Sequence, residues 1–403
     1  MRILFNLLPA LVNIIAGLFL FVSAKRMADC GANSFMIAAT MTAWAFFYAA
    51  TSLTLGRFLT KRNAVFFLLA GQLIMLVSLF GLLLSGTAWQ YFWLTGTGIA
   101  CGSFFTSFQV VVKMFGKEEY TLESVARTTA IYTLSWSFGI ASGPMLTAFV
   151  WGLFSPETGW RYCYVITIVM VFLIILCLLY MNRFVRRKLR ETGELEEHAP
   201  PPEIPQEQKK LPDLIVATWV AGLLAGCVVA MMRTYLPDYC TKVLRLDTFR
   251  QGTVLAVISY AQAFTGLACW KARRWQYHPW VFGLAAAGGI GAMMIFAFAS
   301  SWTAYLTAAL LLGIFYGIFY FTYTFHALID PVKIARNCAG NETIVGLTST
   351  FAPLLGGVLA MQTGEARSPF WLCGGFILAA MVFFGFYSLR AFRKLGQSGQ
   401  VPD

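Results

Sequence analysis

Two charged residues and a row of tyrosines could do chemistry in this sequence. Arg233 and Glu342 each lie within a long apolar stretch, where a charge is costly and usually pairs with another group or has a function. Arg233 could hold a carboxylate or phosphate through a forked contact, or its side chain could extend to the outer edge of the apolar layer. Glu342 could carry a coupling proton, or it could brace an inward gate against a basic residue. The basic residues considered for that gate are Arg57, Lys61, Arg127 and Arg336.

Three tyrosines, Tyr316, Tyr320 and Tyr323, are spaced four and three residues apart, so a helix places them on one face. Aromatic rings with hydroxyl tips can stack on a planar or sugar-like solute and donate hydrogen bonds to it. Such a face could equally be an aromatic packing surface. His326 follows close to the end of the same stretch, where a solvated histidine is expected.

Uncharged polar residues add weaker candidates. Thr106 shares a helical face with Ser103 and Ser107, and Gln109 follows shortly after. Asn13 lies in the middle of an apolar stretch, where an unpaired amide is costly. Each of these residues could contact a substrate or could hydrogen-bond to a neighbouring helix.

No enzyme chemistry is indicated by the remaining residue patterns. The nine cysteines form no CxxC pair, and there is no phosphate-binding glycine loop, no metal-ligand cluster and no nucleophile with a partnered base. The sequence therefore predicts no enzyme activity, no metal and no cofactor. If the protein performs active transport, a proton gradient is the expected energy source.

The elements that carry these residues must lie in a membrane. Of 403 residues, 58% are hydrophobic and only 12% are charged, about half the share of charged residues in a soluble protein. The net charge of +12 is spread in small clusters between apolar runs, which excludes a nucleic-acid-binding face. Cutting the chain at charges and turn residues leaves twelve runs long enough for helices that cross a bilayer, and too long for barrel strands. These runs are 3–24, 33–55, 64–86, 89–115, 127–153, 160–182, 213–235, 250–270, 279–300, 302–327, 338–362 and 369–390.

The distribution of basic residues predicts the orientation. Of the 30 Lys and Arg residues, 22 fall on the side of both termini, which places the termini in the cytoplasm. The only long polar stretch joins the sixth and seventh runs and is rich in charge and proline. We therefore expect an N-terminal six-helix bundle over 1–183, a cytoplasmic linker over 184–212, a C-terminal six-helix bundle over 213–391 and a tail over 392–403.

The two halves repeat each other at an interval of 209 or 210 residues. Arg127 recurs as Arg336, Pro144 as Pro353, and the turn that ends in Lys61 as the turn that ends in Lys271. Two parallel six-helix halves joined by a cytoplasmic linker resemble the major facilitator superfamily over nearly the whole chain.

Two motifs carry this resemblance. The loop after the second run keeps the family's first glycine, Gly56, and a basic position, but Thr60 replaces its aspartate. The fifth run carries part of the family's glycine–proline motif, and the eleventh run carries a related set. These positions, which are expected to form a flexible packing region between the halves, are Gly139, Gly143, Pro144, Pro353, Gly356 and Gly357.

The resemblance implies a secondary active transporter that moves a small organic solute by alternating access. It implies a central site lined by the first, fourth, seventh and tenth helices, and hence by Asn13, Thr106, Gln109, Arg233 and the three tyrosines. In the family, the motif of the fifth run is commoner among proton-coupled exporters, which favours efflux. An uptake permease or uniporter for a sugar, nucleoside or organic acid is the alternative, and a non-transporting receptor or a membrane enzyme is more remote. We expect a monomer that contacts membrane lipid in a plasma membrane, the inner membrane if the source is bacterial.

Overall fold

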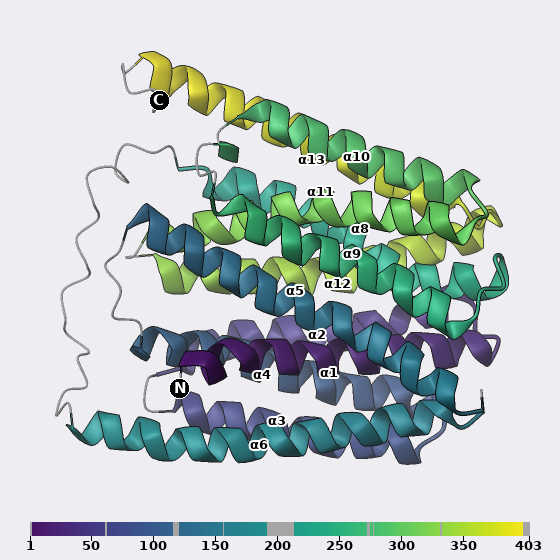
Figure 1. Cartoon of the computed structure of the whole chain (residues 1–403), viewed down its shortest axis with the longest axis horizontal. Helices are drawn as coiled ribbons and strands as arrows, with labels where there is room; N and C mark the ends of the chain where they lie inside the picture. Colours follow the sequence, from purple (N-terminus) through teal and green to yellow (C-terminus); the bar gives the residue numbers. More distant parts are fainter. Residues whose placement is uncertain are drawn as a thin grey trace.

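The computed structural model describes residues 2–60, 63–115, 121–155, 157–191, 213–271, 275–276, 278–330 and 333–397. These residues form twelve long α-helices and no strand (Figure 1). In the N-terminal half the helices are α1 (Arg2–Asp29), α2 (Ser34–Phe58), α3 (Ala64–Leu84), α4 (Gln90–Phe115), α5 (Leu122–Leu153) and α6 (Gly159–Glu191). In the C-terminal half they are α8 (Ile215–Lys242), α9 (Thr248–Cys269), α10 (Pro279–Phe298), α11 (Trp302–Leu328), α12 (Ile334–Thr363) and α13 (Ser368–Gln397). The predicted all-helical fold with two six-helix halves is confirmed.

Ten of these helices are long and apolar enough to cross a membrane. The two others, α4 and α5, are of similar length but carry many Gly, Ser and Thr residues. Helix α4 packs between α2 and α3, and α5 packs between α1 and α9. Small and hydroxyl-bearing residues suit such positions because they let helices approach closely.

Several helices run further than the apolar pattern predicts. Helix α8 continues through Pro237 to Lys242, although its apolar run was expected to end at residue 235. Helix α6 extends through residues 184–191 of the expected linker, and α13 extends through residues 392–397 of the expected tail. Arg, Lys, Leu and Glu favour helix, so a transmembrane helix can project beyond the apolar layer into water. The rest of the expected linker, residues 192–212, lies outside the described residues.

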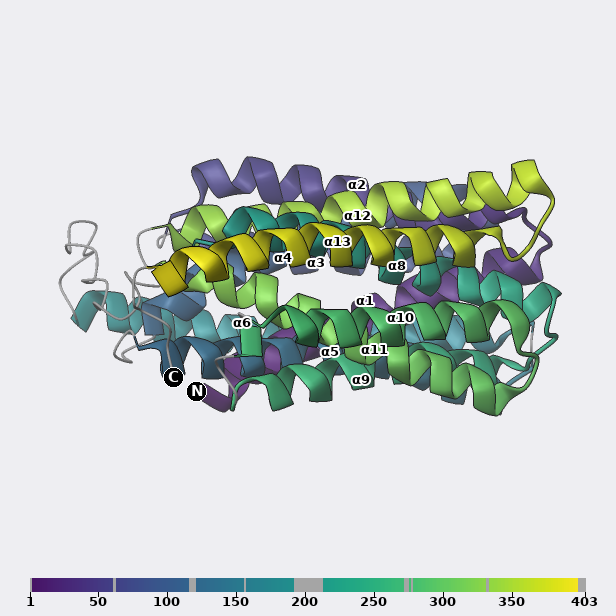
Figure 2. The ribbon, with the colours of Figure 1, turned by 90° about the horizontal axis from the view of Figure 1, so that it is seen from above.

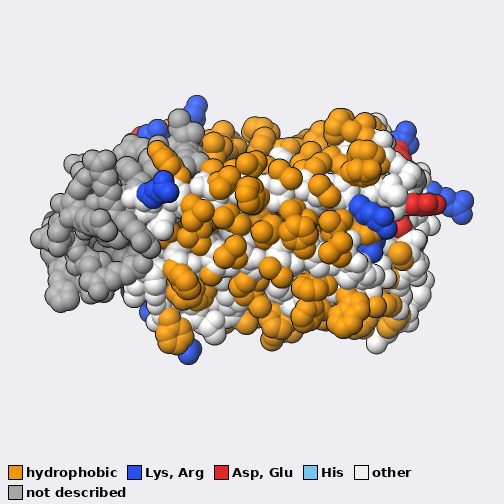
Figure 3. Space-filling view, turned by 90° about the horizontal axis from the view of Figure 1, so that it is seen from below, with side chains coloured by type: hydrophobic (Ala, Val, Ile, Leu, Met, Phe, Trp, Pro, Cys, Tyr) orange, Lys and Arg blue, Asp and Glu red, His pale blue; other side chains and the backbone are white. Residues whose placement is uncertain are grey.

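A broad band of apolar side chains covers the middle of the face seen in Figure 3, with charged side chains toward the ends of the molecule. In most soluble proteins these large side chains would be buried, whereas here Phe66, Phe172 and Val382 are more than half exposed. This band matches the apolar layer of a bilayer, as the charge-poor composition predicts.

The helices lie side by side, and short turns reverse the chain between most of them (Figures 1 and 2). Side-chain caps begin several helices: Asn33 accepts from the Met36 amide at 2.8 Å, and Asp247 accepts from the Arg250 amide at 2.8 Å. Helix α12 ends at Gly364, whose φ of 65° is the left-handed conformation that glycine adopts without strain. We call the end of the molecule where α1 begins and α13 ends the terminal end, and the opposite one the far end.

Two helix pairs form most of the contact between the halves. They are α5 with α9, and α2 with α12. In the internal repeat α2 corresponds to α9 and α5 corresponds to α12, so the two interfaces are equivalent under the repeat. The space between these interfaces is where residues of both halves meet.

Candidate functional site

Two adjoining pockets lie between the halves, with volumes of about 50 and 40 Å³. Arg233 on α8 lines both of them, together with Leu20 on α1, Met41 on α2 and Ile140 on α5. The larger pocket, which we call the central cavity, is also lined by Asn13, Trp136 and Tyr316. The second pocket, the outer pocket, extends from it past Gly17, Phe21 and Ser259. Both halves therefore contribute walls to one polar-edged cavity in an otherwise apolar core.

Arg233 is held by neutral groups. Its Nη2 donates to Ser259 Oγ at 3.1 Å and to Gln262 Oε1 at 3.4 Å, both on α9. Its guanidinium carbon lies 5.6 Å from the ring centre of Trp136, which comes from the other half. Among the described residues, no ion pair includes Arg233. The side chain thus points into the protein interior and does not extend to the surface.

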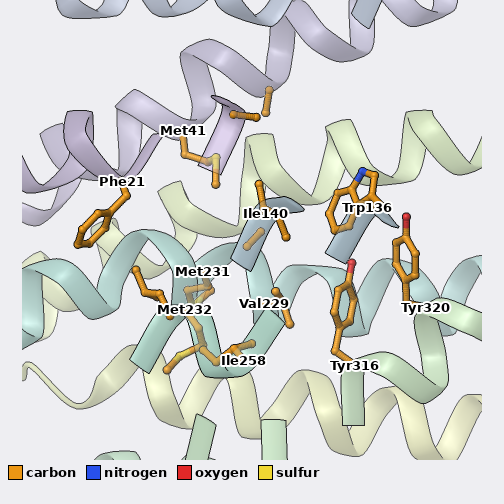
Figure 4. Packing of buried hydrophobic residues seen from close by; sticks show 14 of the residues in the cluster. Phe21, Met41, Trp136, Ile140, Val229, Met231, Met232, Ile258, Tyr316 and Tyr320 are labelled. Carbon is orange, nitrogen blue, oxygen red and sulfur yellow. The ribbon is translucent and has the colours of Figure 1, made fainter. Parts of the chain in front are cut away.

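The three tyrosines on α11 have different surroundings. Tyr316 lines the central cavity. Tyr320 stacks on Trp136 of the other half, with ring centres 5.2 Å apart (Figure 4). Tyr323 packs edge-on against Tyr320 and covers Gly222 on α8. The predicted tyrosine face therefore exists, but only Tyr316 borders the cavity.

The uncharged polar candidates differ in whether they line the cavity. Asn13 is 2% exposed and lines the central cavity, and its amide donates at 2.9 Å to the Pro9 carbonyl of its own helix. One donor of its amide is therefore used by the backbone of its own helix, whereas a hydrogen bond to a neighbouring helix or to a substrate was expected. Thr106 is among neither set of lining residues. The side chain of Gln109 lies outside the described residues.

Glu342 on α12 is 8% exposed and connects the two halves. It accepts a short hydrogen bond from Tyr48 on α2 and one of 3.4 Å from Tyr132 on α5. Both tyrosines belong to the N-terminal half, whereas Glu342 belongs to the C-terminal half. Hydrogen bonds to an ionised carboxylate are about twice as strong as neutral ones, so an ionised Glu342 would draw the halves together.

The basic residues expected at the gate lie at exposed positions or outside the described residues. Arg57, Arg127 and Arg336 are exposed, and Lys61 lies outside the described residues. Beyond Glu342, toward the terminal end, apolar packing joins the halves: Val125, Ala126 and Ala130 of α5 contact Phe321 and Phe325 of α11.

His326 corrects one expectation. It is 2% exposed and meets the Phe325 ring edge-on, with ring centres 5.5 Å apart. The histidine is buried because α11 is covered on this side, although its position near the helix end had suggested solvent.

An ionic cluster joins the halves at the far end. Asp238 on α8 is 3% exposed, pairs with Lys242 at 2.7 Å and accepts from Ser34 Oγ on α2 at 2.6 Å. Lys242 also donates to the Ala32 carbonyl at 2.7 Å. The apolar pattern ended this helix at residue 235, so the buried aspartate was not anticipated.

The glycine and proline positions expected between the halves divide into two groups. A Cβ added at Gly139 or Gly143 would clash with the backbone of α1, and one at Gly356 with Met231 on α8, so these three glycines pack helices within one half. Pro144 and Gly357 do face the other half. The Pro144 carbonyl lies 2.8 Å from an ideal Cβ on Gly252 of α9, and Gly357 approaches the Ser34 carbonyl of α2. Pro353 is buried in α12.

Sequence reasoning missed a large part of the cavity wall. Trp44, Tyr48 and Trp136 come from α2 and α5 of the N-terminal half, and Thr348 and Ser349 come from α12 of the C-terminal half. The family resemblance did not assign these helices to the site. Trp136 carried a usable signal, because it lies one helical turn before Ile140 and two turns before Pro144 on one face of α5. Metal-ligand clusters are absent from the described residues.

Comparisons with known proteins agree with this architecture. The family model of the Major Facilitator Superfamily matches residues 4–332. Proton-coupled antiporter flippase LtaA from two strains of Staphylococcus epidermidis is 24% identical over 178 residues, which cover 43% of this chain. The match spans only 45% of the length of those curated relatives.

Two solved structures share the fold. The human organic anion transporter MFSD10 (TETRAN) superposes with a TM-score of 0.63 at 13% identity and covers 94% of this chain and 97% of its own. A bacterial homologue of the human lysosomal transporter Spinster, in an inward-facing and occupied conformation, gives a TM-score of 0.68 at 14% identity. That match covers 98% of this chain and 97% of the other.

Proposed function

Because the chain belongs to the Major Facilitator Superfamily, a family of membrane transporters and not of enzymes, we propose that it moves a small organic solute by alternating access. The observation that carries this proposal is the cavity between the halves, whose walls come from α1, α2, α4 and α5 on one side and α8, α11 and α12 on the other. A solute bound there touches both halves, so a change in their relative position changes access to it.

Contacts on both sides of the cavity support a rocking motion. Asp238 and Lys242 join the halves toward the far end, and Glu342 with its two tyrosines joins them toward the terminal end. Opening the cavity to one side requires one of these sets to break while the other holds. Each set consists of a few hydrogen bonds, which the free energy of solute binding or of a proton gradient can offset.

We propose that Glu342 is the group that couples transport to protons. It is a buried acid at an interface that must separate during the cycle, and protonation removes the charge that strengthens its bonds to Tyr48 and Tyr132. The curated relatives named proton-coupled antiporter flippase add support to this coupling.

We propose export in exchange for protons, with both termini in the cytoplasm and the protein acting as a monomer in a plasma membrane. The basic residues gathered on the side of the termini support the orientation. With this orientation the Glu342 contacts lie on the cytoplasmic side of the cavity and the Asp238 contacts on the outer side.

Transport by purified protein in liposomes tests the proposal. Solutes are first ranked by how far they raise the melting temperature of the full-length protein across compound classes. The best ligand is then measured in counterflow, and again with a pH gradient imposed in each direction. The expected results are counterflow of the solute and, under an imposed pH gradient, movement of the solute in the direction opposite to that of the protons.

Three results would count against parts of the proposal. Counterflow with no response to either pH gradient would indicate a uniporter, and solute movement along with protons would indicate uptake. A ligand that binds but shows no counterflow at all would indicate a receptor.

A further inference from the structure

The charge of Arg233 lacks a counter-ion among the described residues. Its two hydrogen-bond partners, Ser259 and Gln262, are neutral, and Trp136 offers only the face of its ring. A guanidinium removed from water is costly unless a negative group or a well-matched set of acceptors compensates it. No acidic residue is among those that line the two pockets. The cavity is therefore electropositive and rejects cationic solutes.

The guanidinium also has donors left for a ligand. Both of its hydrogen bonds use Nη2, whereas Nε and Nη1 make none to the described residues. Nε and Nη1 carry three of the five N–H donors of an arginine. Arg233 lines both pockets, so these donors lie where a bound solute would lie. An oxyanion supplies the acceptors and the charge that they lack.

Rings and apolar side chains surround this charge. Tyr316 and Tyr320 point toward Trp136, with Ile140 and Val229 beside them (Figure 4). Such walls suit a flat or apolar body, since aromatic faces stack on rings at little conformational cost. Arg233 and Tyr316 come from the C-terminal half and Trp136 and Ile140 from the N-terminal half, so a ligand with both parts would touch both halves.

The cavity volume sets the size of the part that fits in this conformation. A pocket needs about 10–15 Å³ to hold one water molecule, so about 50 Å³ accommodates a group of a few heavy atoms. A carboxylate or phosphate group fits that space, and a ring attached to it requires the halves to move apart.

We propose that Arg233 binds the anionic group, a carboxylate or a phosphate, of the transported solute, while a ring-bearing body of the solute lies against Trp136 and Tyr316. This inference rests on the proposed transport function and adds the substrate class. It predicts that Arg233 selects solutes for their negative charge and that the neighbouring walls select them for an aromatic or apolar body.

The test uses four small probes on the full-length protein in detergent: benzoate, phenyl phosphate, the neutral benzamide and the cationic benzylamine. Millimolar benzoate, phenyl phosphate or both should raise the melting temperature of the wild type, and benzamide and benzylamine should not. Comparison of the two anions shows whether the site prefers a carboxylate or a phosphate as the anionic group of the solute. Arg233→Gln should weaken the apparent affinity for the anion that binds more tightly by at least about tenfold, as expected for loss of a charged hydrogen-bond partner.

Two further variants keep the result interpretable. Arg250→Gln removes an exposed arginine at the far end and should bind the anions like the wild type. Arg233→Lys keeps the charge but not the flat fork, so it should weaken anion binding by several-fold and still prefer the anion that binds more tightly over benzamide. If Arg233→Gln fails to fold, the lysine variant alone decides.

Three outcomes would overturn the proposal. They are equal stabilisation by benzamide and by the anion that binds more tightly, unchanged anion binding in the Arg233 variants, and no stabilisation of the wild type by either anion. Counterflow separates this inference from the proposed function. If a neutral or cationic solute is transported at the same rate by the wild type and by Arg233→Gln, only the anion site is refuted. If anions bind at Arg233 but no solute shows counterflow, only transport is refuted.

Discussion

The two interfaces between the halves are equivalent under the internal repeat but differ in chemistry. The α5–α9 interface is held by small residues and neutral hydroxyls, such as Gly252 against Pro144 and Ser142 with Tyr260 at 3.0 Å. The α2–α12 interface has small-residue packing as well, but it also contains the ionisable Glu342, bonded to Tyr48 of α2.

This difference separates packing from control. Close approach of the helices is common to both interfaces, so it belongs to the scaffold that the repeat provides. Of the hydrogen bonds described for the two interfaces, the one with a carboxylate is the bond from Tyr48 to Glu342 at α2–α12. We therefore expect both interfaces to be sensitive to bulk, and only one to transmit pH.

The largest effect is expected from filling either interface. An ideal Cβ on Gly252 would lie 2.5 Å from the Ala148 Cβ, and one on Gly346 would lie 2.4 Å from the Ala49 Cβ. Gly252→Leu and Gly346→Leu should each hold the halves apart and lower the counterflow rate by at least about tenfold, since overpacking typically costs about 1–3 kcal/mol. Initial rates in proteoliposomes, at matched protein content, provide the measurement.

Gly291→Leu is the matched control for bulk in a transmembrane helix. Gly291 on α10 has no atom within 4 Å of its ideal Cβ, so its variant should transport at the wild-type rate. A normal rate for one filled interface and a lost rate for the other would contradict their mechanical equivalence.

The second prediction sharpens the chemical difference. Glu342→Gln keeps the size and an acceptor oxygen but removes the charge and the proton site. A gradient of one pH unit supplies about 1.4 kcal/mol per proton, enough for about tenfold accumulation. The variant should lose this accumulation and keep counterflow, which needs no gradient. Accumulation that persists in Glu342→Gln would remove the coupling role from this residue.

The length of the apolar runs in the sequence determines how much of the fold could be predicted. The number of helices and the division into two halves could be predicted from runs of about 20 apolar residues and from the sides on which Lys and Arg fall. The structure confirms both. Helix ends were less accurate, because an apolar run stops at the edge of the lipid whereas hydrogen bonding continues. Asp238 was missed for this reason: it lies past Pro237, where the apolar run had already ended.

The site was predicted in part, because position along a helix is easier to read than direction around it. Asn13 and Tyr316 were identified as polar residues near mid-span and Arg233 as a charge in the outward part of its span, and the structure places all three on the cavity. A helix in a membrane is apolar on its lipid-facing side as well as on its packed side, so the apolar pattern did not indicate the direction in which Tyr48 points. The tyrosine partners of Glu342 were missed because charge alone suggested arginine and lysine, whereas tertiary packing also brings Tyr48 and Tyr132 to it.

The third prediction measures the strength of the charged contact directly. A double-mutant cycle with Tyr48→Phe and Glu342→Gln isolates the interaction across α2–α12, since each change removes the charged hydrogen bond and keeps the shape. Hydrogen bonds to charged groups contribute about 1.5–3 kcal/mol, and the coupling energy should lie in that range. Chemical unfolding of the detergent-solubilised variants gives the four free energies. A value near zero would mean that Tyr48 and Glu342 do not hold the halves together.

The smallest effect is expected for the equivalent cycle at the other interface. Ser142→Ala and Tyr260→Phe remove a neutral hydroxyl pair between α5 and α9, for which about 0.5–1.5 kcal/mol is typical. The ring of Tyr260 stays packed on Phe138, with ring centres 5.2 Å apart, so the interface should keep its shape. Because neither residue carries a charge at neutral pH, both single variants should retain the full pH-driven accumulation. A coupling energy that equals that of Tyr48 and Glu342, or a loss of pH response in either variant, would show that the two interfaces share control as well as packing.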